Sequence, residues 1–470
     1  MNQLFSQDKL NIINVGLKGF GPDAMSQGAV VKQVEWKPVA GGRKDIIEAL
    51  DKVEPLAEKI KEANETVISR MKAAKPVLVG MDLALNVVPE MTEHTILHAG
   101  PPIAWENMCG PMRGAVIGAV LFEGLAADDE EAVKLIESGA IKFDPCHEHK
   151  AVGPMAGVLS AHMPVHIVKN ETNGDFAYCS INEGLGKVLR FGAYSKEVLD
   201  RLAFLRDEFM PVMQKALALT DGIDIKLITA QALQMGDECH NRNKAATSLF
   251  YKQISQLILE TDCEKAAIQK ALSFIAGNDH YFLNLSMPAC KLITEAGQNV
   301  PYATIVSTMA RNGVEFGIKV SGIGTGEWFD YASNYIEGLY FPGYSKEDAN
   351  PDIGDSAITE TTGIGGMSMA GAPAIVQFVG GDVEDAFNTT KRMYGITTDI
   401  NAAYAIPNMN FKGAPMGIDM LKVIESGVLP VINTGIAHKE AGIGQIGAGI
   451  VNPPMECFYQ ALLAYVKKYA

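Results

Sequence analysis

The sequence predicts a mixed α/β fold with several domains. Short apolar runs of strand length alternate with helical patterns along most of the chain, and glycine accounts for 46 of the 470 residues, about 10% where ~7% is usual. A chain of this length commonly folds as about two to four domains. Apolar residues make up 47% and charged residues 20%, so the chain can bury a large core and we expect little disorder.

Residues 1–100 predict a βαβ-like N-terminal domain. Apolar runs at 11–16 and 30–36 have strand length and flank a short helical stretch near 23–27, which is the order of a βαβ unit. Residues 43–75 carry apolar side chains at helical spacing among many charges, and they predict one or two exposed helices.

The rest of the chain predicts a glycine-rich α/β main domain that is interrupted by helices. A buried strand is expected at 76–85, and a boundary follows near residue 100. Residues 101–230 and 298–470 mix strands, turns and helices and are assigned to the main domain. Residues 231–297 change to helical spacing and predict an inserted helical subdomain. Its apolar positions include Ala246, Leu249, Phe250, Ile254, Leu257 and Ile258.

Charge, hydropathy and cysteine usage narrow the class of protein. Lys and Arg number 40 against 55 Asp and Glu, a net charge of −15, and such a surface repels phosphate backbones, so we expect no nucleic-acid partner. No apolar stretch is long enough to span a bilayer, and the N-terminus lacks the pattern of a secretory leader. The seven cysteines are scattered without a CxxC spacing, which predicts reduced thiols and a cytoplasmic protein.

The segment 144–157, DPCHEHKAVGPMAG, gathers candidate acid–base residues. If 146–149 is extended, His147 and His149 share one face of the strand. They can act as an acid–base pair, contact an anion, bind a metal or be purely structural. Lys150 favours an anion over a cation, and no recognised ligand spacing is matched, so we expect no metal. Two further histidines follow and can complete a metal set: His162 and His166.

A second candidate segment is 236–249, GDECHNRNKAATSL. On a helical wheel, Arg242 and Asn243 fall within roughly 60° of the apolar stripe of the following helix, and His240 lies at its edge. An Arg and an Asn entering an apolar face can bind a carboxylate or phosphate. The alternative is that Arg242 pairs with a core carboxylate such as Asp237.

Three weaker candidates occur elsewhere. Arg113 is followed by small residues, so the backbone there can approach a ligand closely. Arg311 and Asn312 precede a glycine at a turn, although either arginine can instead be a surface residue. The GNDH sequence at 277–280 can be a helix cap, or an acid–base set if a pocket lies there.

Glycine-rich loops do not support a nucleotide cofactor. GIGQIG at 442–447 fits the dinucleotide spacing but does not directly follow a predicted strand, and prolines soon interrupt any helix after it. GLKGFG at 16–21 has better strand context but the wrong glycine spacing. The loops at 321–326 and 363–371 can wrap an anion, yet they lack the Lys-Ser/Thr ending of an ATP-binding loop. We therefore expect no cofactor.

Several long blocks of the sequence are distinctive. Among them are INVGLKGFGPDAMSQGAVVKQVEWKPVAGG, FDPCHEHKAVGPMAGVLS, ARNGVEFGIKVSG and PVINTGIAHKEAGIGQIGAG. Together they resemble the bacterial YahG/YlbE family, whose YlbE-type members are described as the AllG subunit of oxamate carbamoyltransferase. The resemblance implies purine-nitrogen catabolism, in which oxalurate and phosphate give oxamate and carbamoyl phosphate. It also implies AllF-type and AllH-type companion subunits, and we expect a homo-oligomer. It carries no assigned catalytic residues.

The candidate residues can be placed in that reaction. Arg242 and Asn243 are expected to bind the substrate carboxylate, with His240, Arg311 and Asn312 as further substrate contacts. Because these residues must meet at one small substrate, we expect segments 144–157 and 237–246 to face the same cleft. Phosphate is assigned to Arg113 and Lys150, and proton transfer to His147 and His149. Three alternatives stay open: a non-catalytic subunit, a metal-dependent hydrolase, and a paralogue acting on a related small carboxylate or amide.

Overall fold

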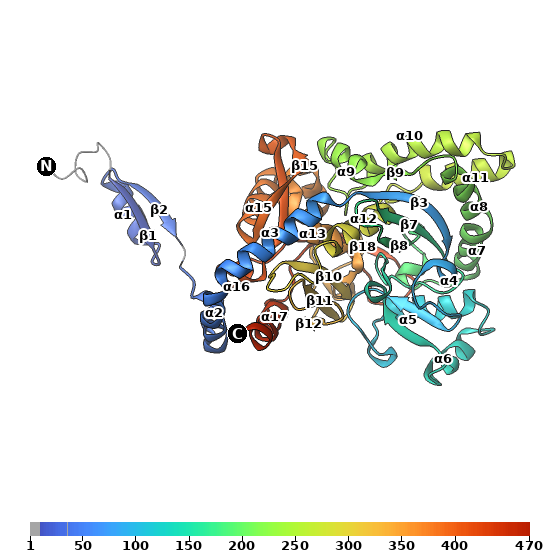
Figure 1. Ribbon diagram of the computed structural model, residues 1–470, viewed down its shortest axis with the longest axis horizontal. Coiled ribbons are helices and arrows are strands. Elements are labelled where there is room, and N and C mark those ends of the chain that lie inside the picture. Colours follow the sequence, from blue (N-terminus) through green and yellow to red (C-terminus); the bar gives the residue numbers. More distant parts are fainter. Residues whose placement is uncertain (1–9, 35) are drawn as a thin grey trace.

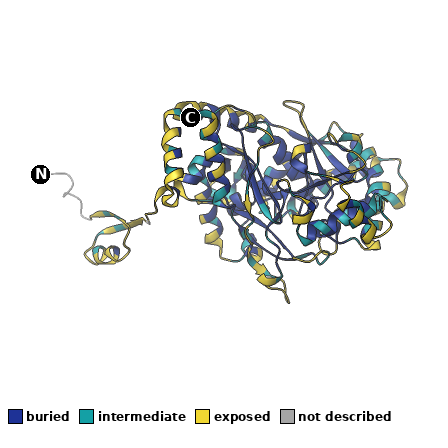
Figure 2. Cartoon of the chain, turned by 90° about the horizontal axis from the view of Figure 1, so that it is seen from below, coloured by how far each residue is buried: buried dark blue, intermediate teal, exposed yellow. Residues whose placement is uncertain are grey.

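The computed structural model describes residues 10–34 and 36–470, and its fold is mixed α/β. The strands of this part of the chain form six small sheets of two to five strands, with helices packed around them. Figure 1 shows one large body and a small N-terminal unit that stands apart from it. Burial follows the same division, since the body has a continuous buried interior and the N-terminal unit is mostly exposed (Figure 2).

The N-terminal unit has the order strand, helix, strand. Strand β1 (Asn11–Val15) and strand β2 (Val30–Val34) pair in parallel, and helix α1 (Phe20–Ser26) lies between them in sequence. Apolar side chains in this unit are open to solvent, including Ile13 at 69% and Leu17 at 73% exposure. A sheet of two strands offers too little surface to bury them.

Two helices lead from this unit into the body. Helix α2 (Lys44–Val53) and helix α3 (Ala57–Ala73) occupy the region expected to be helical, and a short 3₁₀ turn containing Pro55 separates them. The next strand, β3 (Pro76–Leu83), pairs with strands from much later in the chain. The boundary expected near residue 100 therefore cuts through a sheet, because pairing partners are chosen by tertiary contact and not by sequence proximity.

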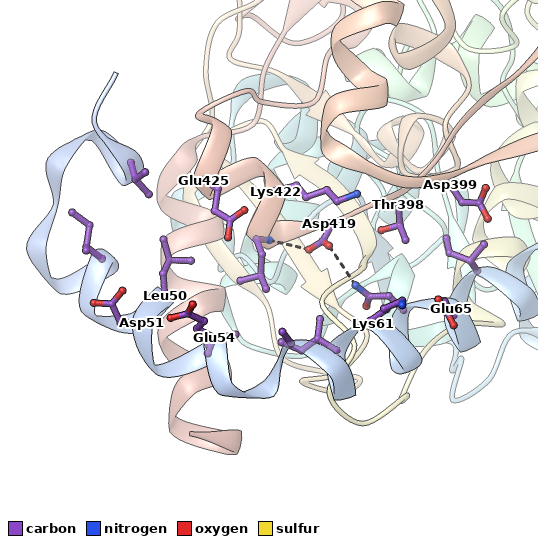
Figure 3. Close-up of a pocket in the computed structure, with 18 of the residues that line it drawn as sticks. Leu50, Asp51, Glu54, Lys61, Glu65, Thr398, Asp399, Asp419, Lys422 and Glu425 are labelled. Atoms are coloured by element: carbon purple, nitrogen blue, oxygen red, sulfur yellow. Dashed lines mark hydrogen bonds between the residues drawn. The ribbon is translucent and has the colours of Figure 1, made fainter. Parts of the chain in front are cut away.

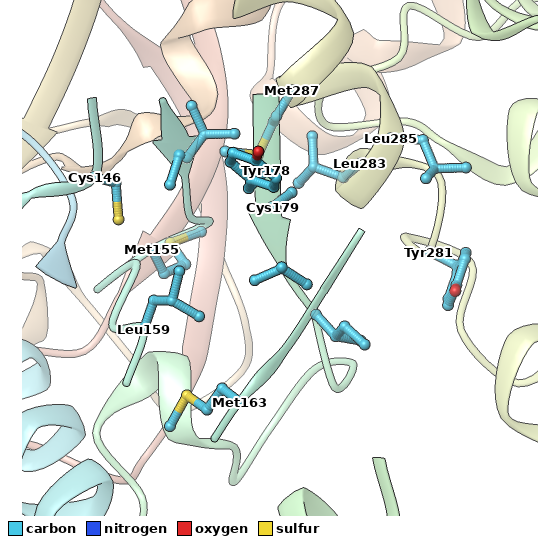
Figure 4. Packing of buried hydrophobic residues seen from close by; sticks show 14 of the residues in the cluster. Cys146, Met155, Leu159, Met163, Tyr178, Cys179, Tyr281, Leu283, Leu285 and Met287 are labelled. Atoms are coloured by element: carbon cyan, nitrogen blue, oxygen red, sulfur yellow. The ribbon is translucent and has the colours of Figure 1, made fainter. Parts of the chain in front are cut away.

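The five-stranded sheet is the centre of the larger core. Its strands, in spatial order, are β6 (Ala151–Val152), β8 (Phe176–Ser180), β7 (Pro164–Asn170), β3 and β9 (Ile223–Asp224). Helix α12 (Leu283–Glu295) contacts β7 and β8, and its residues from Leu283 to Thr294 are all buried. Figure 4 shows part of this buried cluster, which includes Met155, Leu159, Tyr178, Leu283 and Met287.

Helices fill the region between the sheet and the edge of the molecule, and the two at 244–260 and 265–276 lie where the helical spacing predicts them. They are α7 (Lys196–Phe204), α8 (Met210–Leu217), α9 (Ile225–Gln234), α10 (Lys244–Glu260) and α11 (Lys265–Ala276). Phe250 on α10 stacks on Tyr281, with ring centroids 5.6 Å apart. The helices of 231–297 are thus present, but α12 belongs to the main core, so this segment is not separate from the sheet that it covers.

The C-terminal part contributes three further sheets. The four-stranded sheet has the order β12 (Phe329–Ala332), β11 (Glu315–Val320), β10 (Val306–Asn312) and β14 (Ile353–Gly354). The three-stranded sheet has β13 (Glu337–Tyr340), β18 (Gln445–Val451) and β17 (Ile432–Ala437), and β15 (Thr397–Ile406) pairs with β16 (Lys412–Ile418). Helices α13 (Ile358–Thr362), α15 (Val383–Ile396), α16 (Met420–Ser426) and α17 (Met455–Tyr469) pack among them.

The remaining elements close one end of the body. Strand β4 (Thr95–His98) pairs in parallel with β5 (Lys142–Pro145), and helices α5 (Gly110–Phe122) and α6 (Asp129–Glu137) connect them. The glycines at 442–447 span the turn from β17 into β18, which is a strand-to-strand connection. Among the described residues, no helix has the length and apolar character needed to cross a membrane.

Candidate functional site

A small polar cavity lies where several loops of the body meet. Its volume is about 20 Å³, about the space of one water molecule. Strands β17 and β18 contribute Thr434, Gly435 and Gln445 to it. The polar residues that line it are Arg190, His240, Asn241, His280, Ser356, Thr434 and Gln445, and Pro154, Met155, Leu185, Leu283 and Gly435 complete the wall.

His240 is held by a buried carboxylate. Its Nδ1 lies 2.7 Å from Oε1 of Glu360, whose side chain is fully buried on helix α13. Glu360 also accepts hydrogen bonds from the Gly366 amide at 2.8 Å and the Thr359 hydroxyl at 2.9 Å. The carboxylate therefore keeps a proton on Nδ1, and no described residue hydrogen-bonds to Nε2. This arrangement leaves Nε2 available to a ligand in the cavity.

His280 lies in the same wall and is uncharged near neutral pH. Burial lowers its pKa to about 4, and the positive charge of Arg190 acts in the same direction. Arg190, His240 and His280 all line the same cavity. The GNDH segment that contains His280 follows helix α11, and the Asn278 side chain accepts from the His280 amide at 3.1 Å. The segment is thus both a turn and part of a pocket wall.

Arg311, expected to contact substrate, is a structural residue instead. It is fully buried, and its guanidinium donates to both oxygens of Asp352 at 2.7 and 2.8 Å. It also reaches two wall residues, Ser356 at 3.4 Å and Thr434 at 3.3 Å. Asn312 organises a turn, with its side-chain oxygen accepting from the Val314 amide. Arg311 therefore supports the cavity wall from behind.

The expected pairing of His147 and His149 is wrong. Residues Cys146–His149 form a 3₁₀ helix, so the two rings do not share a face as they would on a strand. His149 contacts the Pro89 carbonyl at 2.6 Å through Nδ1 and Asp144 at 3.2 Å through Nε2.

His147 lies in a separate buried network behind the cavity. Lys291 donates to its Nδ1 at 3.2 Å, and its Nε2 is 3.6 Å from Asp355. Burial and the charges of Lys291 and Lys319 lower the pKa of His147 far below its usual value. Asp355 accepts from the amides of Gly100 and Gly153 at 2.8 and 3.0 Å, and burial raises its pKa to about 7.

Arg242 and Asn243 do not line the cavity. Arg242 lies over the Phe378 ring at 6.0 Å and borders a different surface pocket of about 300 Å³. It makes no hydrogen bond to Asp237, which instead accepts from backbone amides at the start of α10 and has a pKa raised by burial to about 6. Asn243 donates to the His240 carbonyl. Arg242 and Asn243, the two residues expected to bind the substrate carboxylate, therefore lie outside the wall of this cavity.

The two proposed phosphate contacts are also outside the cavity wall. Arg113 donates to the Glu106 carbonyl and packs over the Trp105 ring at 5.3 Å. Lys150 is exposed and lies 3.5 Å from Asp175. The two segments expected to face one cleft do meet at the cavity, but through Pro154 and Met155 of one and His240 and Asn241 of the other. Of the residues singled out as substrate contacts, His240 alone lines it.

A much larger groove occurs elsewhere, between helices α2 and α3 and the elements β15 and α16 (Figure 3). Its volume is about 1620 Å³, and six carboxylates line it against three lysines. Asn64 and Thr304 both bond Asp419 at its base, at 3.3 and 2.8 Å. The excess of acidic groups disfavours a small anionic substrate, so the smaller cavity is the better candidate.

Sequence reasoning missed most of the polar residues that line the cavity, Arg190 among them, and it missed Glu360, the carboxylate that holds His240. Arg190 lies in the unremarkable segment GKVLR, and Glu360 lies in a run of threonines. Neither residue belongs to a recognisable sequence motif. The role of each depends on partner residues that only the fold brings near. Among the described residues, no group of three or more His, Cys, Asp and Glu side chains is arranged to hold a metal ion.

Comparison with known proteins decides the family. A model of the family "Oxamate carbamoyltransferase subunit AllG" matches residues 141–356. The chain is 49% identical over 468 residues to the Escherichia coli K12 protein named "Uncharacterized protein YahG", which covers 99% of both chains. It is 47% identical over 408 residues to the E. coli K12 oxamate carbamoyltransferase subunit AllG, 86% of this chain and 97% of that one. The chain belongs to the AllG family.

A solved structure has a similar fold. A crystal structure of a conserved protein of unknown function from Enterococcus faecalis V583 superposes with a TM-score of 0.87 at 53% identity, covering 88% of this chain and 99% of that chain. The span matched by the AllG family model contains Arg190, His240, His280 and Ser356. Most of the cavity wall therefore lies within the segment by which the family is defined.

Proposed function

We propose that this protein is a subunit of an oxamate carbamoyltransferase-type complex and that it carries the reaction site. The observation that carries the proposal is the convergence of His240, held by Glu360, with His280 and Arg190 on one cavity. The relationship to the AllG subunit of E. coli supports the reaction class. The substrates are oxalurate and phosphate, and the products are oxamate and carbamoyl phosphate.

The proposed reaction needs one proton to move between two reactants. An oxygen of hydrogen phosphate attacks the carbamoyl carbon of oxalurate, the bond from that carbon to the nitrogen shared with the oxamate part breaks, and this nitrogen leaves as the amide NH2 of oxamate. The proton lost by hydrogen phosphate is the proton gained by that nitrogen. Nε2 of His240 accepts the proton and then returns it, while Glu360 stabilises the imidazolium that forms between the two steps.

Other wall residues are suited to the carbonyl oxygen of the carbamoyl group. Negative charge develops on this oxygen during attack, and donors placed in advance lower the barrier. The Nδ2 group of Asn241 is buried and has no hydrogen-bond partner among the described residues, so it can donate to this oxygen. His280, neutral because its pKa is about 4, can donate a hydrogen bond there without adding a charge that competes with phosphate.

The assembly belongs to the same proposal. AllF-type and AllH-type companion subunits complete the complex, and this chain forms a homo-oligomer within it. The cavity of about 20 Å³ is smaller than oxalurate, so the wall must open for the substrate to enter. The competing proposal is that this chain is a structural subunit and that a companion carries the chemistry, which the closed cavity favours.

The test is carbamoyl phosphate formation by the reconstituted complex with His240→Gln in this subunit. We expect a loss of about 10²- to 10⁴-fold in kcat, the usual contribution of a general acid–base residue. The matched control is His94→Gln, because His94 is exposed and its side chain is distant from the cavity wall. Full activity of the His240→Gln complex would reject the site and favour the structural role.

A further inference from the structure

The guanidinium of Arg190 is buried with too few acceptors. The residue is 7% exposed, and burial lowers its pKa to about 10. Among the described residues its hydrogen bonds go to a single atom, the Gly184 carbonyl oxygen, from Nε at 3.1 Å and from Nη2. A buried arginine ordinarily has a carboxylate or several acceptors. Nε and Nη2 of Arg190 therefore share one carbonyl oxygen, although this side of a guanidinium can bind the two oxygens of a carboxylate.

That carbonyl belongs to a short strap over the cavity, made of Gly184, Leu185 and Gly186. Both glycines have positive φ angles, +114° and +90°. Leu185 lines the cavity on one side and is 53% exposed. A Cβ atom at Gly444 would lie 2.7 Å from the Gly186 carbonyl, so the strap also packs tightly against the turn between β17 and β18. At the other end of the strap, the hydrogen bonds from Arg190 fix the Gly184 carbonyl.

Arg190 also separates two cavities. It lines the polar cavity described above and a second one of about 30 Å³, which Ser180 and Glu183 border. Moving the strap carbonyl away from the guanidinium frees the donor pair and enlarges the space beside it. The negative charge of Glu183 acts on Arg190 and disfavours a dianion at this position more than a monoanion.

We propose that Arg190 binds the carboxylate of the substrate, and that this carboxylate replaces the Gly184 carbonyl so that the strap opens. The inference rests on the proposed function, because it assigns the carboxylate end of oxalurate and oxamate to this guanidinium. A carboxylate offers two oxygens to the planar fork and a charge opposite to that of the guanidinium, whereas the Gly184 carbonyl offers one oxygen and no net charge. Replacement of the Gly184 carbonyl by the carboxylate is therefore favourable, and ligand binding is coupled to opening of the strap.

The first test measures oxamate binding to the full-length chain, alone and in the reconstituted complex, by calorimetry. Arg190→Lys keeps the charge but loses the planar fork, and we expect oxamate to bind roughly 10- to 150-fold more weakly. The matched control is Arg206→Lys, because Arg206 is paired with Asp207 away from the cavity; its oxamate affinity should equal that of wild type. Oxamide, which replaces the carboxylate by a neutral amide, should bind weakly to wild type and no worse to Arg190→Lys.

The second test follows the strap by hydrogen exchange of the amides of residues 184–188. Saturating oxamate should raise their exchange rates in wild type, and Arg190→Lys should show raised rates without ligand. If Arg190 is purely structural, Arg190→Lys will show raised exchange rates without ligand but will bind oxamate as tightly as wild type. That outcome would overturn the inference. Absence of oxamate binding to wild type in both forms would also overturn it. Inorganic phosphate that binds as tightly as oxamate and loses the same factor in Arg190→Lys would replace the carboxylate assignment by a phosphate site.

These outcomes are separable from the outcome for the proposed function. Oxamate binding needs no turnover, so His240→Gln should retain it while losing carbamoyl transfer. If His240→Gln transfers normally and Arg190→Lys still loses oxamate, the catalytic assignment fails and the carboxylate site stands. If Arg190→Lys binds oxamate as tightly as wild type while His240→Gln abolishes transfer, the carboxylate site fails and the catalytic assignment stands.

Discussion

Nδ1 of His240 lies 2.7 Å from Oε1 of Glu360, although the two residues are 120 positions apart in the chain. The histidine follows helix α9 and the glutamate lies on helix α13, and both side chains are almost completely buried. A carboxylate on one ring nitrogen directs the other nitrogen to the neighbouring cavity. This pair is the feature of the structure that most resembles catalytic machinery.

Glu360→Gln should impair catalysis while preserving the shape of the site. The amide oxygen can still accept from Nδ1, but the negative charge that stabilises the imidazolium is lost. We expect kcat for carbamoyl phosphate formation to fall by at least about 10-fold, with a smaller change in KM for oxalurate. Glu384→Gln is the control, because Glu384 is exposed and paired only at the surface with Lys391. An unchanged kcat would separate Glu360 from the chemistry.

Arg311→Met should strongly destabilise the fold. The change leaves Asp352 buried without its partner, and breaking a buried ion pair in this way costs about 3–5 kcal/mol in the free energy of unfolding. Arg43→Met breaks an exposed pair with Asp45, and we expect a cost below about 1 kcal/mol. Urea unfolding of both variants gives the two values, and equal values would contradict the supporting role of Arg311.

His280 should make a pH-dependent contribution to stability. Its pKa is about 4 in the folded protein, against 6.5 for an ordinary histidine, so between these values the unfolded chain binds more protons. Stability from His280 is therefore present above about pH 6.5 and is lost as the pH falls towards 4, by up to about 3 kcal/mol. Asp355, with its raised pKa of about 7, has the opposite slope, since it loses stability as the pH rises from about 4 to 7.

The two slopes can be separated by comparing wild type with His280→Gln. The difference between their unfolding free energies should grow from pH 4.5 to pH 7, because only wild type carries the His280 contribution. Urea unfolding at both pH values measures it. A difference that stays constant over this range would mean that the surroundings of His280 do not lower its pKa.

Gly444→Ala should loosen the strap without touching Arg190. An added Cβ would lie 2.7 Å from the Gly186 carbonyl, and the φ angle of +108° disfavours any side chain. We expect faster hydrogen exchange at residues 184–188, while the amides of the five-stranded sheet keep their protection. Gly139→Ala also replaces a glycine of positive φ but has no atom within 4 Å of the added carbon, so it should leave the strap unchanged.

The sequence by itself determined the properties that depend on neighbouring residues. Apolar side chains recur at helical spacing in 244–260, so this segment forms helix α10 in any packing that covers that face. The alternating strands of the N-terminal unit and the buried run of β3 were equally evident. The mixed α/β class and the family followed from such local patterns and from blocks of sequence that extend along most of the chain.

Only the tertiary structure decided which polar residues work together. Arg311 and Arg190 are both buried arginines, but one faces Asp352 from 41 positions away and the other faces a nearby carbonyl beside a cavity. His147 and His149 were expected to act together and were separated by a single turn of 3₁₀ helix. A polar side chain acquires its role from the charge and the space opposite it. Those are supplied by distant segments through burial of the apolar core, which local spacing does not encode.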